Sequence, residues 1–175
     1  VNMSVVDDDK IRIAGVIKES TVDGPGFRYV IFTQGCPHHC EGCHNPGTHD
    51  MNGGKLESIT TLAEDITKNP LLKGITLSGG EPFMQAKKLA KLLSLIDLKR
   101  YSVMTYTGFK YEYLISNAND DNGYLELLKL TDVLIDGKFM KDLKSSSAKF
   151  RGSTNQRAID VKSSLKENRI ILHEF

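Results

Sequence analysis

All three cysteines of this 175-residue chain, Cys36, Cys40 and Cys43, lie within eight residues in a C-x3-C-x2-C pattern. Glycine and proline residues surround them, so we expect this stretch to form a loop rather than a helix or a strand. An odd number of clustered cysteines is not a disulfide framework and, in a cytosolic protein, indicates metal or redox chemistry. We therefore expect the chain to fold as a scaffold that holds the loop of residues 35–54 at a metal site.

Length and composition narrow the classes of protein that the chain can belong to. A chain of 175 residues is long enough for one domain with a hydrophobic core, so we expect a single domain over residues 1–175, with residues 1–9 flexible. The formal net charge of +1 gives no electrostatic argument for binding nucleic acid or a membrane surface. No apolar run is long enough to cross a bilayer, and the first residues do not resemble a signal peptide. We expect a cytoplasmic protein.

Segments with strand and helix patterns alternate along most of the chain. We predict strands over 10–18, 27–33, 74–78, 101–106, 132–136, 158–161 and 169–174, and helices over 58–68, 84–98, 111–118 and 124–130. The first helix begins at Ser58 or at Thr61, because Thr61 and Glu64 have the spacing of a capping box. Alternating elements imply a parallel sheet with right-handed crossovers. Because the chain is shorter than an eight-fold barrel requires, we predict an α/β fold that forms a partial, open barrel with a mainly parallel sheet.

Four loop motifs directly follow predicted strands. They are the cysteine loop, Gly79-Gly80-Glu81, Thr107-Gly108 and Asp136-Gly137-Lys138. Ligands of parallel α/β folds bind at the carboxyl ends of the strands. We therefore expect these four motifs to meet on one rim of the sheet.

The spacing of the cysteines permits two kinds of metal site. One is a zinc site, in which a nearby histidine completes the three thiolates; the candidates are His38, His39, His44 and His49. The other is an iron–sulfur site. A cubane cluster contains four irons, so three thiolates leave one iron without a protein ligand. Spacing alone does not decide between them.

The order of the motifs resembles a known enzyme family. The cysteine pattern, followed after the next strand by Gly79-Gly80-Glu81-Pro82, resembles the radical S-adenosylmethionine (SAM) enzymes, and Asp23-Gly24-Pro25-Gly26 resembles their branch that activates glycyl-radical proteins. Three further stretches are similar to the activating proteins of anaerobic ribonucleoside-triphosphate reductases: 106–108, 132–137 and 151–157. The resemblance covers roughly residues 11–161.

This resemblance implies a reaction and its cofactors. In such a radical SAM-type β/α barrel, Cys36, Cys40 and Cys43 hold a [4Fe-4S] cluster, and SAM chelates the open iron. Reductive cleavage of SAM then yields a radical that removes hydrogen from a glycine of the partner, the anaerobic ribonucleoside-triphosphate reductase. A flavodoxin-like protein supplies the electron. The remaining alternatives are the activation of another glycyl-radical enzyme and, in a different class, a zinc-binding adaptor without enzymatic activity.

The resemblance also implies which residues contact SAM. We expect no catalytic residue beyond the cluster and a SAM site that consists of Gly42, His44, Gly79, Gly80, Glu81, Asp136 and Lys138. Gly79 and Gly80 permit close approach of the methionine part, and Glu81 orients SAM or holds the loop. Lys138 is a cationic partner for the SAM carboxylate. Many relatives have an aromatic residue near adenine where this chain has Gly42, so His44 and backbone groups are expected to hold the adenine. Three further residues are candidates for gripping a carboxylate or docking the partner protein: Arg151, Asn155 and Arg157.

Overall fold

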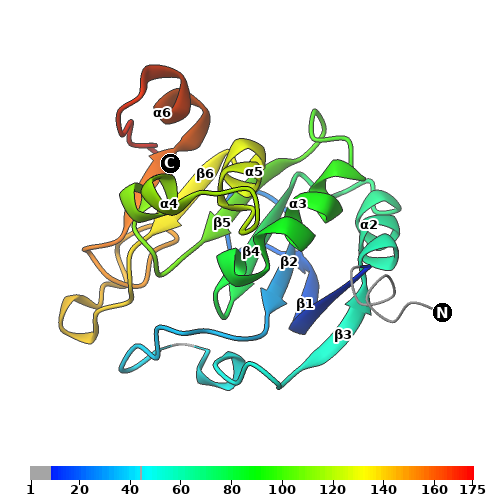
Figure 1. Cartoon of the computed structure of the whole chain (residues 1–175), viewed down its shortest axis with the longest axis horizontal. Helices are drawn as coiled ribbons and strands as arrows, with labels where there is room; N and C mark the ends of the chain where they lie inside the picture. The colour runs from blue at the N-terminus through cyan, green and yellow to red at the C-terminus, as the bar shows by residue number, and fades with distance from the viewer. Residues whose placement is uncertain (1–8, 44) are drawn as a thin grey trace.

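The computed structural model describes residues 9–43 and 45–175, so nearly all of the expected flexible segment 1–9, and His44, lie outside the described residues. The described chain forms a seven-stranded sheet with helices (Figure 1). The strands are β1 (Lys10–Ser20), β2 (Arg28–Thr33), β3 (Lys55–Ser58), β4 (Gly74–Gly79), β5 (Ser102–Tyr106), β6 (Val133–Asp136) and β7 (Arg157–Asp160). The α-helices are α2 (Ile59–Thr67), α3 (Ala86–Ser94), α4 (Tyr111–Asn117), α5 (Tyr124–Leu130) and α6 (Val161–Glu167), and short 3-10 helices are η1 (Pro46–Thr48), η2 (Pro82–Gln85) and η3 (Lys141–Leu143).

The sheet is mixed and open, in the order β3-β1-β2-β4-β5-β6-β7. Its four central strands, β2, β4, β5 and β6, run parallel to one another, as the sequence predicted. The outer strands are antiparallel to their neighbours: β1 pairs with β2 and β3, and β7 pairs with β6. The open, mainly parallel barrel is therefore confirmed, with antiparallel additions at both edges.

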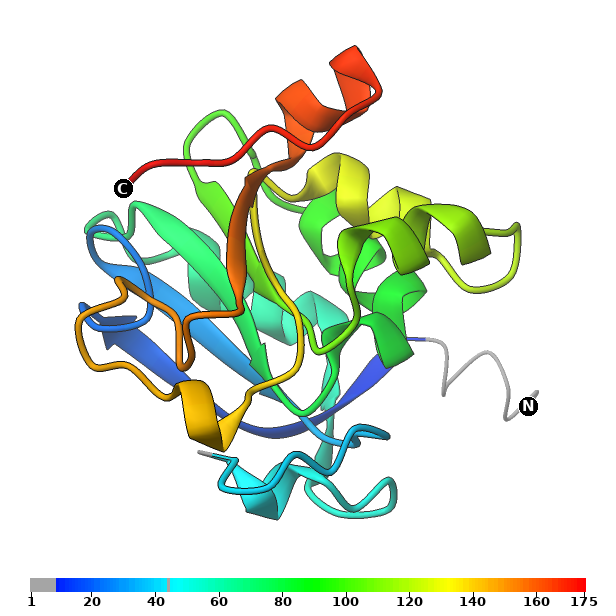
Figure 2. The same ribbon diagram turned by 90° about the vertical axis from the view of Figure 1, so that its left-hand side faces the viewer.

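The two faces of the sheet differ in chemistry. Helices α2, α3, α4 and α5 cover one face, where Ile75 and Leu77 of β4 point into the main hydrophobic core (Figures 1 and 2). The alternate residues, Thr76 and Ser78, belong to the opposite face, as the two-residue period of a strand requires. This face is partly polar, and the loops that line the cavities described below close over its edge.

A buried arginine joins the polar face to the turn between β1 and β2. Arg28 is 1% exposed, and its guanidinium donates to Thr76 Oγ1 at 2.8 Å and to the Pro25 carbonyl oxygen at 3.1 Å. Burial lowers the pKa of Arg28 to about 10. The Thr76 hydroxyl in turn donates to the carbonyl oxygen of Asp23 at 2.9 Å. These bonds fix the Asp23-Gly24-Pro25-Gly26 turn against the strands.

Several predicted boundaries differ from the structure. Ser58 is the N-cap of α2 and accepts a hydrogen bond from the Thr61 N–H at 3.2 Å, so the alternative start at Thr61 is wrong. The helix predicted over 84–98 is shorter, because a 3-10 turn that begins at Pro82 precedes it.

Three elements near the sheet edges were missed or misassigned. Neither the short edge strand β3 nor helix α6 was predicted. Asp160 is the N-cap of α6 and accepts from the Ser163 N–H at 3.0 Å, but the strand predicted over 158–161 includes this residue. The strand predicted over 169–174 is wrong: this segment makes only an isolated bridge between Leu172 and Ile159.

Among the residues that the structure describes, no helix is both long and apolar enough to span a membrane.

Candidate functional site

The loops after the four parallel strands meet at one edge of the sheet, as expected. They enclose a cavity of about 410 Å³, which we call the cluster cavity. Its lining includes the three cysteines, the glycine pair after β4 and the residues that follow β5 and β6, namely Cys36, Cys40, Cys43, Gly79, Gly80, Thr107, Gly108 and Gly137. The parallel strands thus bring together motifs that lie up to a hundred residues apart in the sequence.

The three cysteines that line the cavity are free thiols. Burial raises the pKa of both Cys36 and Cys40. Within the described residues, no three His, Cys, Asp or Glu side chains already stand in the arrangement of a metal site. The thiols therefore share one cavity, and a metal group would have to draw them together and displace their protons.

The glycine pair allows the end of β4 to lie against the cysteine loop. Gly79 has φ +94°, and a Cβ there would lie 2.5 Å from the Thr33 nitrogen. A Cβ on Gly80 would overlap the carbonyl oxygen of Gly35 and lie 2.9 Å from that of Thr48. The backbone N–H groups of Gly80 and Glu81 donate to Thr33 and Gly35, both at 2.8 Å. Side chains at either glycine position would therefore clash with this backbone and separate the turn from the cysteine loop.

Glu81 is at the centre of a buried network that ties three loops together. Its carboxylate, 0% exposed, lies 2.6 Å from His38 Nε2 in the cysteine loop. The other oxygen accepts from the Phe83 N–H at 3.0 Å. From the loop after β5, the Thr107 hydroxyl donates to both carboxylate oxygens at 2.9 Å, and the Gly108 N–H donates at 2.7 Å. Of the two roles expected for Glu81, this geometry favours holding the loop.

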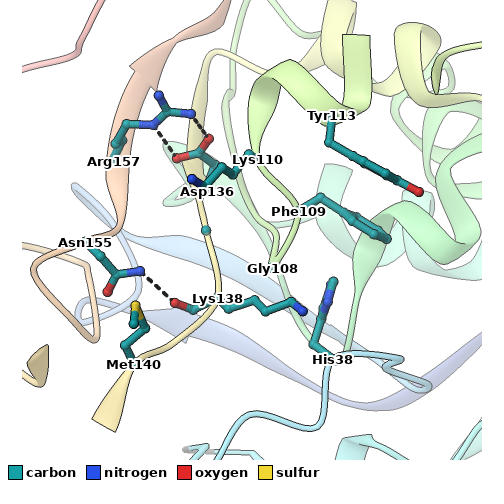
Figure 3. Close-up of a pocket in the computed structure, with 11 residues that line it drawn as sticks. His38, Gly108, Phe109, Lys110, Tyr113, Asp136, Lys138, Met140, Asn155 and Arg157 are labelled. Atoms are coloured by element: carbon teal, nitrogen blue, oxygen red, sulfur yellow. Dashed lines mark hydrogen bonds and ion pairs between the residues drawn. The ribbon is translucent and has the colours of Figure 1, made fainter. Parts of the chain in front are cut away.

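A second cavity of about 670 Å³ lies next to the first, and the two share His38, Gly108 and Gly137 as wall residues. Asp136 and Lys138 line this second cavity. Figure 3 shows that the Lys138 side chain extends across it toward His38 (Figure 3). Lys138 therefore lies near the boundary between the cavities.

The Asp136 carboxylate already has protein partners. It is 1% exposed and accepts from the Tyr111 N–H at 2.8 Å, while Arg157 binds its two oxygens at 3.0 and 2.5 Å. Arg157 also donates to Glu112 on α4. Hydrogen bonds with Asp136 raise the pKa of Arg157 despite its burial. Asp136 thus joins β6, α4 and β7 beside the cavity.

Two predicted SAM contacts remain, Gly42 and His44. Gly42, with φ +72°, turns the cysteine loop beside Phe139 and Lys141 and is not among the residues that line either cavity. His44 lies outside the described residues. Of the histidines considered for a zinc site, His38 is held by Glu81, and the ring of His39 lies edge-on to that of His49 at 5.1 Å.

The cavity wall holds two residues that the predicted SAM site did not include. His49 Nε2 and Arg151 Nε are buried and have no hydrogen-bond partner among the described residues. A polar ligand with an acceptor group, such as a carboxylate, would satisfy the Arg151 donor. Arg151 was a candidate from its motif; His49 had no signal beyond its place in the loop. The residues present thus fit a cluster that three thiolates hold and an organic ligand beside it.

Comparisons with known proteins agree with this site. The family described as "4Fe-4S single cluster domain" matches residues 22–159. The chain is 37% identical to the anaerobic ribonucleoside-triphosphate reductase-activating protein of Enterobacteria phage T4, over 78% of this chain and 85% of that protein. It is 36% identical to the protein of the same name from Escherichia coli K12, over 77% and 89%. It is also 35% identical to the pyruvate formate-lyase-activating enzyme of Clostridium pasteurianum, over 75% of this chain but 54% of that enzyme.

The match to the 4Fe-4S family spans more than half of the chain, and both reductase-activating relatives exceed 30% identity over most of their length. These findings agree with three cysteines on one cavity and favour the iron–sulfur interpretation over zinc. The chain belongs to the 4Fe-4S single cluster family and, within it, to the anaerobic ribonucleoside-triphosphate reductase-activating proteins.

Proposed function

We propose that this protein activates an anaerobic ribonucleoside-triphosphate reductase by forming a glycyl radical on it, with a [4Fe-4S] cluster and SAM as cofactors. The observation that carries the proposal is a single cavity lined by three free thiols and by Gly79 and Gly80. Three thiolates leave one iron of a cubane open to SAM.

The cysteine loop provides the ligands: Cys36, Cys40 and Cys43 hold the cluster. When bound there, a [4Fe-4S] cluster would supply the electron for the reductive cleavage of SAM, and this chemistry would remove a hydrogen atom from the partner's glycine. Gly79 and Gly80 let the end of β4 lie directly against the backbone of the cysteine loop, so that their own backbone lines the cavity where we place the methionine part of SAM. Arg151 Nε and the Lys138 ammonium are the cationic partners for its carboxylate.

Other residues act by positioning these groups. Glu81 fixes the loops after β2, β4 and β5 relative to one another through His38, Thr107 and Gly108. Asp136 and Arg157 hold the start of the loop that carries Lys138. Gly42 shapes the cysteine loop, and we assign the adenine contact to His44, the residue after Cys43 in the sequence. We further propose a cytoplasmic setting and a flavodoxin-like protein as the electron donor.

The reductase is a better-supported partner than another glycyl-radical enzyme. The aligned region covers 85–89% of the two reductase-activating relatives but about half of the pyruvate formate-lyase-activating enzyme. A protein substrate also suits a sheet that is not closed into a barrel.

Electron paramagnetic resonance (EPR) tests this proposal directly. Anaerobically purified protein, reduced with dithionite, should show a cluster signal that changes when SAM is added, and addition of the reductase should produce a glycyl-radical signal on the reductase. A colourless protein with stoichiometric zinc and no sulfide would refute the cofactor assignment. Cleavage of SAM without a radical on the reductase, but with one on pyruvate formate-lyase, would refute the partner assignment.

A further inference from the structure

The loop that follows β6 carries most of the positive charge near the two cavities. We call residues 138–157 the basic strip: it contains four lysines and two arginines but a single acid, Asp142, which gives a formal charge of +5. The whole chain has a net charge of +1, so the remaining residues sum to −4. The positive charge is therefore concentrated on one segment, and this segment lines both cavities.

Four of these six cations have no acidic partner in the part of the chain that the structure describes. Within the described residues, ion pairs engage Lys141, with Glu41, and Arg157, with Glu112 and Asp136. None is found for Lys138, Lys144, Lys149 or Arg151. Lys144 and Lys149 are also exposed. The strip thus presents a positive potential to solvent that the fold itself does not neutralise.

The second cavity adds apolar and hydrogen-bonding groups to this charge. On one side, the rings of Phe109 and Tyr113 stack with centroids 4.9 Å apart and planes 8° from parallel, and Tyr113 remains 46% exposed. On the other side lie Met140, 48% exposed, and Asn155 (Figure 3). The buried Oδ1 of Asn155 has no hydrogen-bond partner among the described residues, so it can accept from an incoming N–H group.

We propose that the basic strip and the second cavity form the docking surface for the protein substrate, and that they bind an acidic segment carrying an aromatic side chain. The carboxylates of this segment complement Lys144 and Lys149, which the proposed SAM site does not use. Its aromatic ring packs beside Phe109 and Tyr113, and a backbone N–H donates to Asn155. The shared walls at His38, Gly108 and Gly137 place the segment next to the cluster cavity. This inference rests on the proposed function, because it identifies the surface that presents the target glycine.

An acidic protein segment fits this surface better than nucleic acid does. The chain outside the strip is net negative and would repel an extended polyanion, whereas a short segment contacts only the strip. The exposed apolar groups Tyr113 and Met140 also favour a partner with apolar side chains.

The test is to reverse charge on the strip without touching the proposed cofactor contacts. The variant is Lys144→Glu with Lys149→Glu. The matched control, Lys99→Glu with Lys166→Glu, makes the same change in net charge. Lys99 precedes β5 and Lys166 is in α6 beyond β7, so both lie toward the edge opposite the cavities. Two substitutions test the aromatic wall: Tyr113→Ala removes the ring, and Tyr113→Phe retains it.

Each variant is assayed with dithionite as reductant, so that no protein donor is needed, for SAM cleavage alone and for glycyl-radical formation as a function of reductase concentration. The strip reversal should raise the half-saturating reductase concentration about tenfold at low salt, and less at high salt. Tyr113→Ala should also raise it, whereas Tyr113→Phe and the control pair should not. SAM cleavage without the reductase should be unchanged.

Two outcomes would overturn the proposal: an unchanged half-saturating concentration for the strip reversal, or an equal effect of the control pair. Oligonucleotide binding that the strip reversal abolishes, with reductase activation intact, would assign the surface to nucleic acid instead. If wild-type protein forms no radical on the reductase, the proposed function itself fails, and this control identifies that case.

Discussion

Replacing Glu81 with glutamine should destabilise the protein, because the amide cannot satisfy the donors that surround it. One carboxylate oxygen faces His38, Thr107 and the Gly108 N–H, while the other faces Thr107 and the Phe83 N–H. If the glutamine NH₂ replaces the second oxygen, it meets the Phe83 N–H at 3.0 Å, donor against donor. If it replaces the first, it meets the Gly108 N–H.

Either orientation leaves a buried donor unsatisfied and removes a charge-assisted hydrogen bond. For a fully buried group the cost is about 3 kcal/mol, which corresponds to a fall in Tm of roughly 6–12 °C for a chain of this length. Glu112→Gln is the matched control: the Glu112 side chain is 58% exposed, and loss of its ion pair with Arg157 should cost at most about 1 kcal/mol.

Circular dichroism of anaerobically prepared, cluster-free samples measures both unfolding transitions under the same conditions. Cluster-free protein is used so that a change in cluster occupancy does not contribute to the shift in Tm. If Glu81→Gln and Glu112→Gln shift Tm equally, the buried network does not have the stabilising role that we assign to it.

Three further predictions follow from the same structure. Replacing any one of the three cysteines with alanine should abolish the reduced-cluster EPR signal and SAM cleavage; a variant that keeps both would contradict the ligand assignment. Gly80→Ala should lower Tm strongly because its Cβ would overlap the Gly35 carbonyl oxygen. Gly47→Ala, in the cysteine loop, should be tolerated, since nothing lies within 4 Å of its Cβ; equal Tm values would refute this. A hydrogen bond from Arg157 lowers the pKa of Glu112. The difference in unfolding free energy between wild type and Glu112→Gln should therefore be largest near neutral pH and disappear as pH falls through the lowered pKa. Urea titrations at several pH values measure this difference, and a difference that grows at acid pH would contradict the prediction.

Local sequence patterns were sufficient to predict much of the central sheet. Strands β4 and β5 are short apolar runs with glycine or turn residues after them, and such runs indicate buried strands whatever lies beside them. The edges were harder to predict. Strand β3 has the sequence Lys-Leu-Glu-Ser, which has no strand pattern of its own. This segment forms a strand because it pairs with β1. The residues of the last predicted strand, 169–174, are apolar enough for a strand but contact the sheet through a single bridge.

In the candidate site, too, some features were predictable from local sequence and others depend on contacts between distant segments. The ligand set and the glycine pair were predictable, because the cysteines are neighbours in sequence and because glycine at a strand end indicates close backbone approach. The role of His38 was not: its partner Glu81 is 43 residues away. Likewise, Asp136 was predicted as a SAM contact, but Arg157, brought beside it by the antiparallel pairing of β6 and β7, binds its carboxylate.

The chemistry of the site can be read from local sequence: three cysteines without a fourth, a glycine pair, and alternating strands and helices that carry them to one edge of a sheet. Which polar groups are already paired within the protein, and which remain available to a ligand, follows from the fold. Glu81 and Asp136 are paired, whereas Arg151 Nε and Asn155 Oδ1 have no partner among the described residues. Such pairing depends on strand order and register, because these bring together side chains that lie far apart in the sequence.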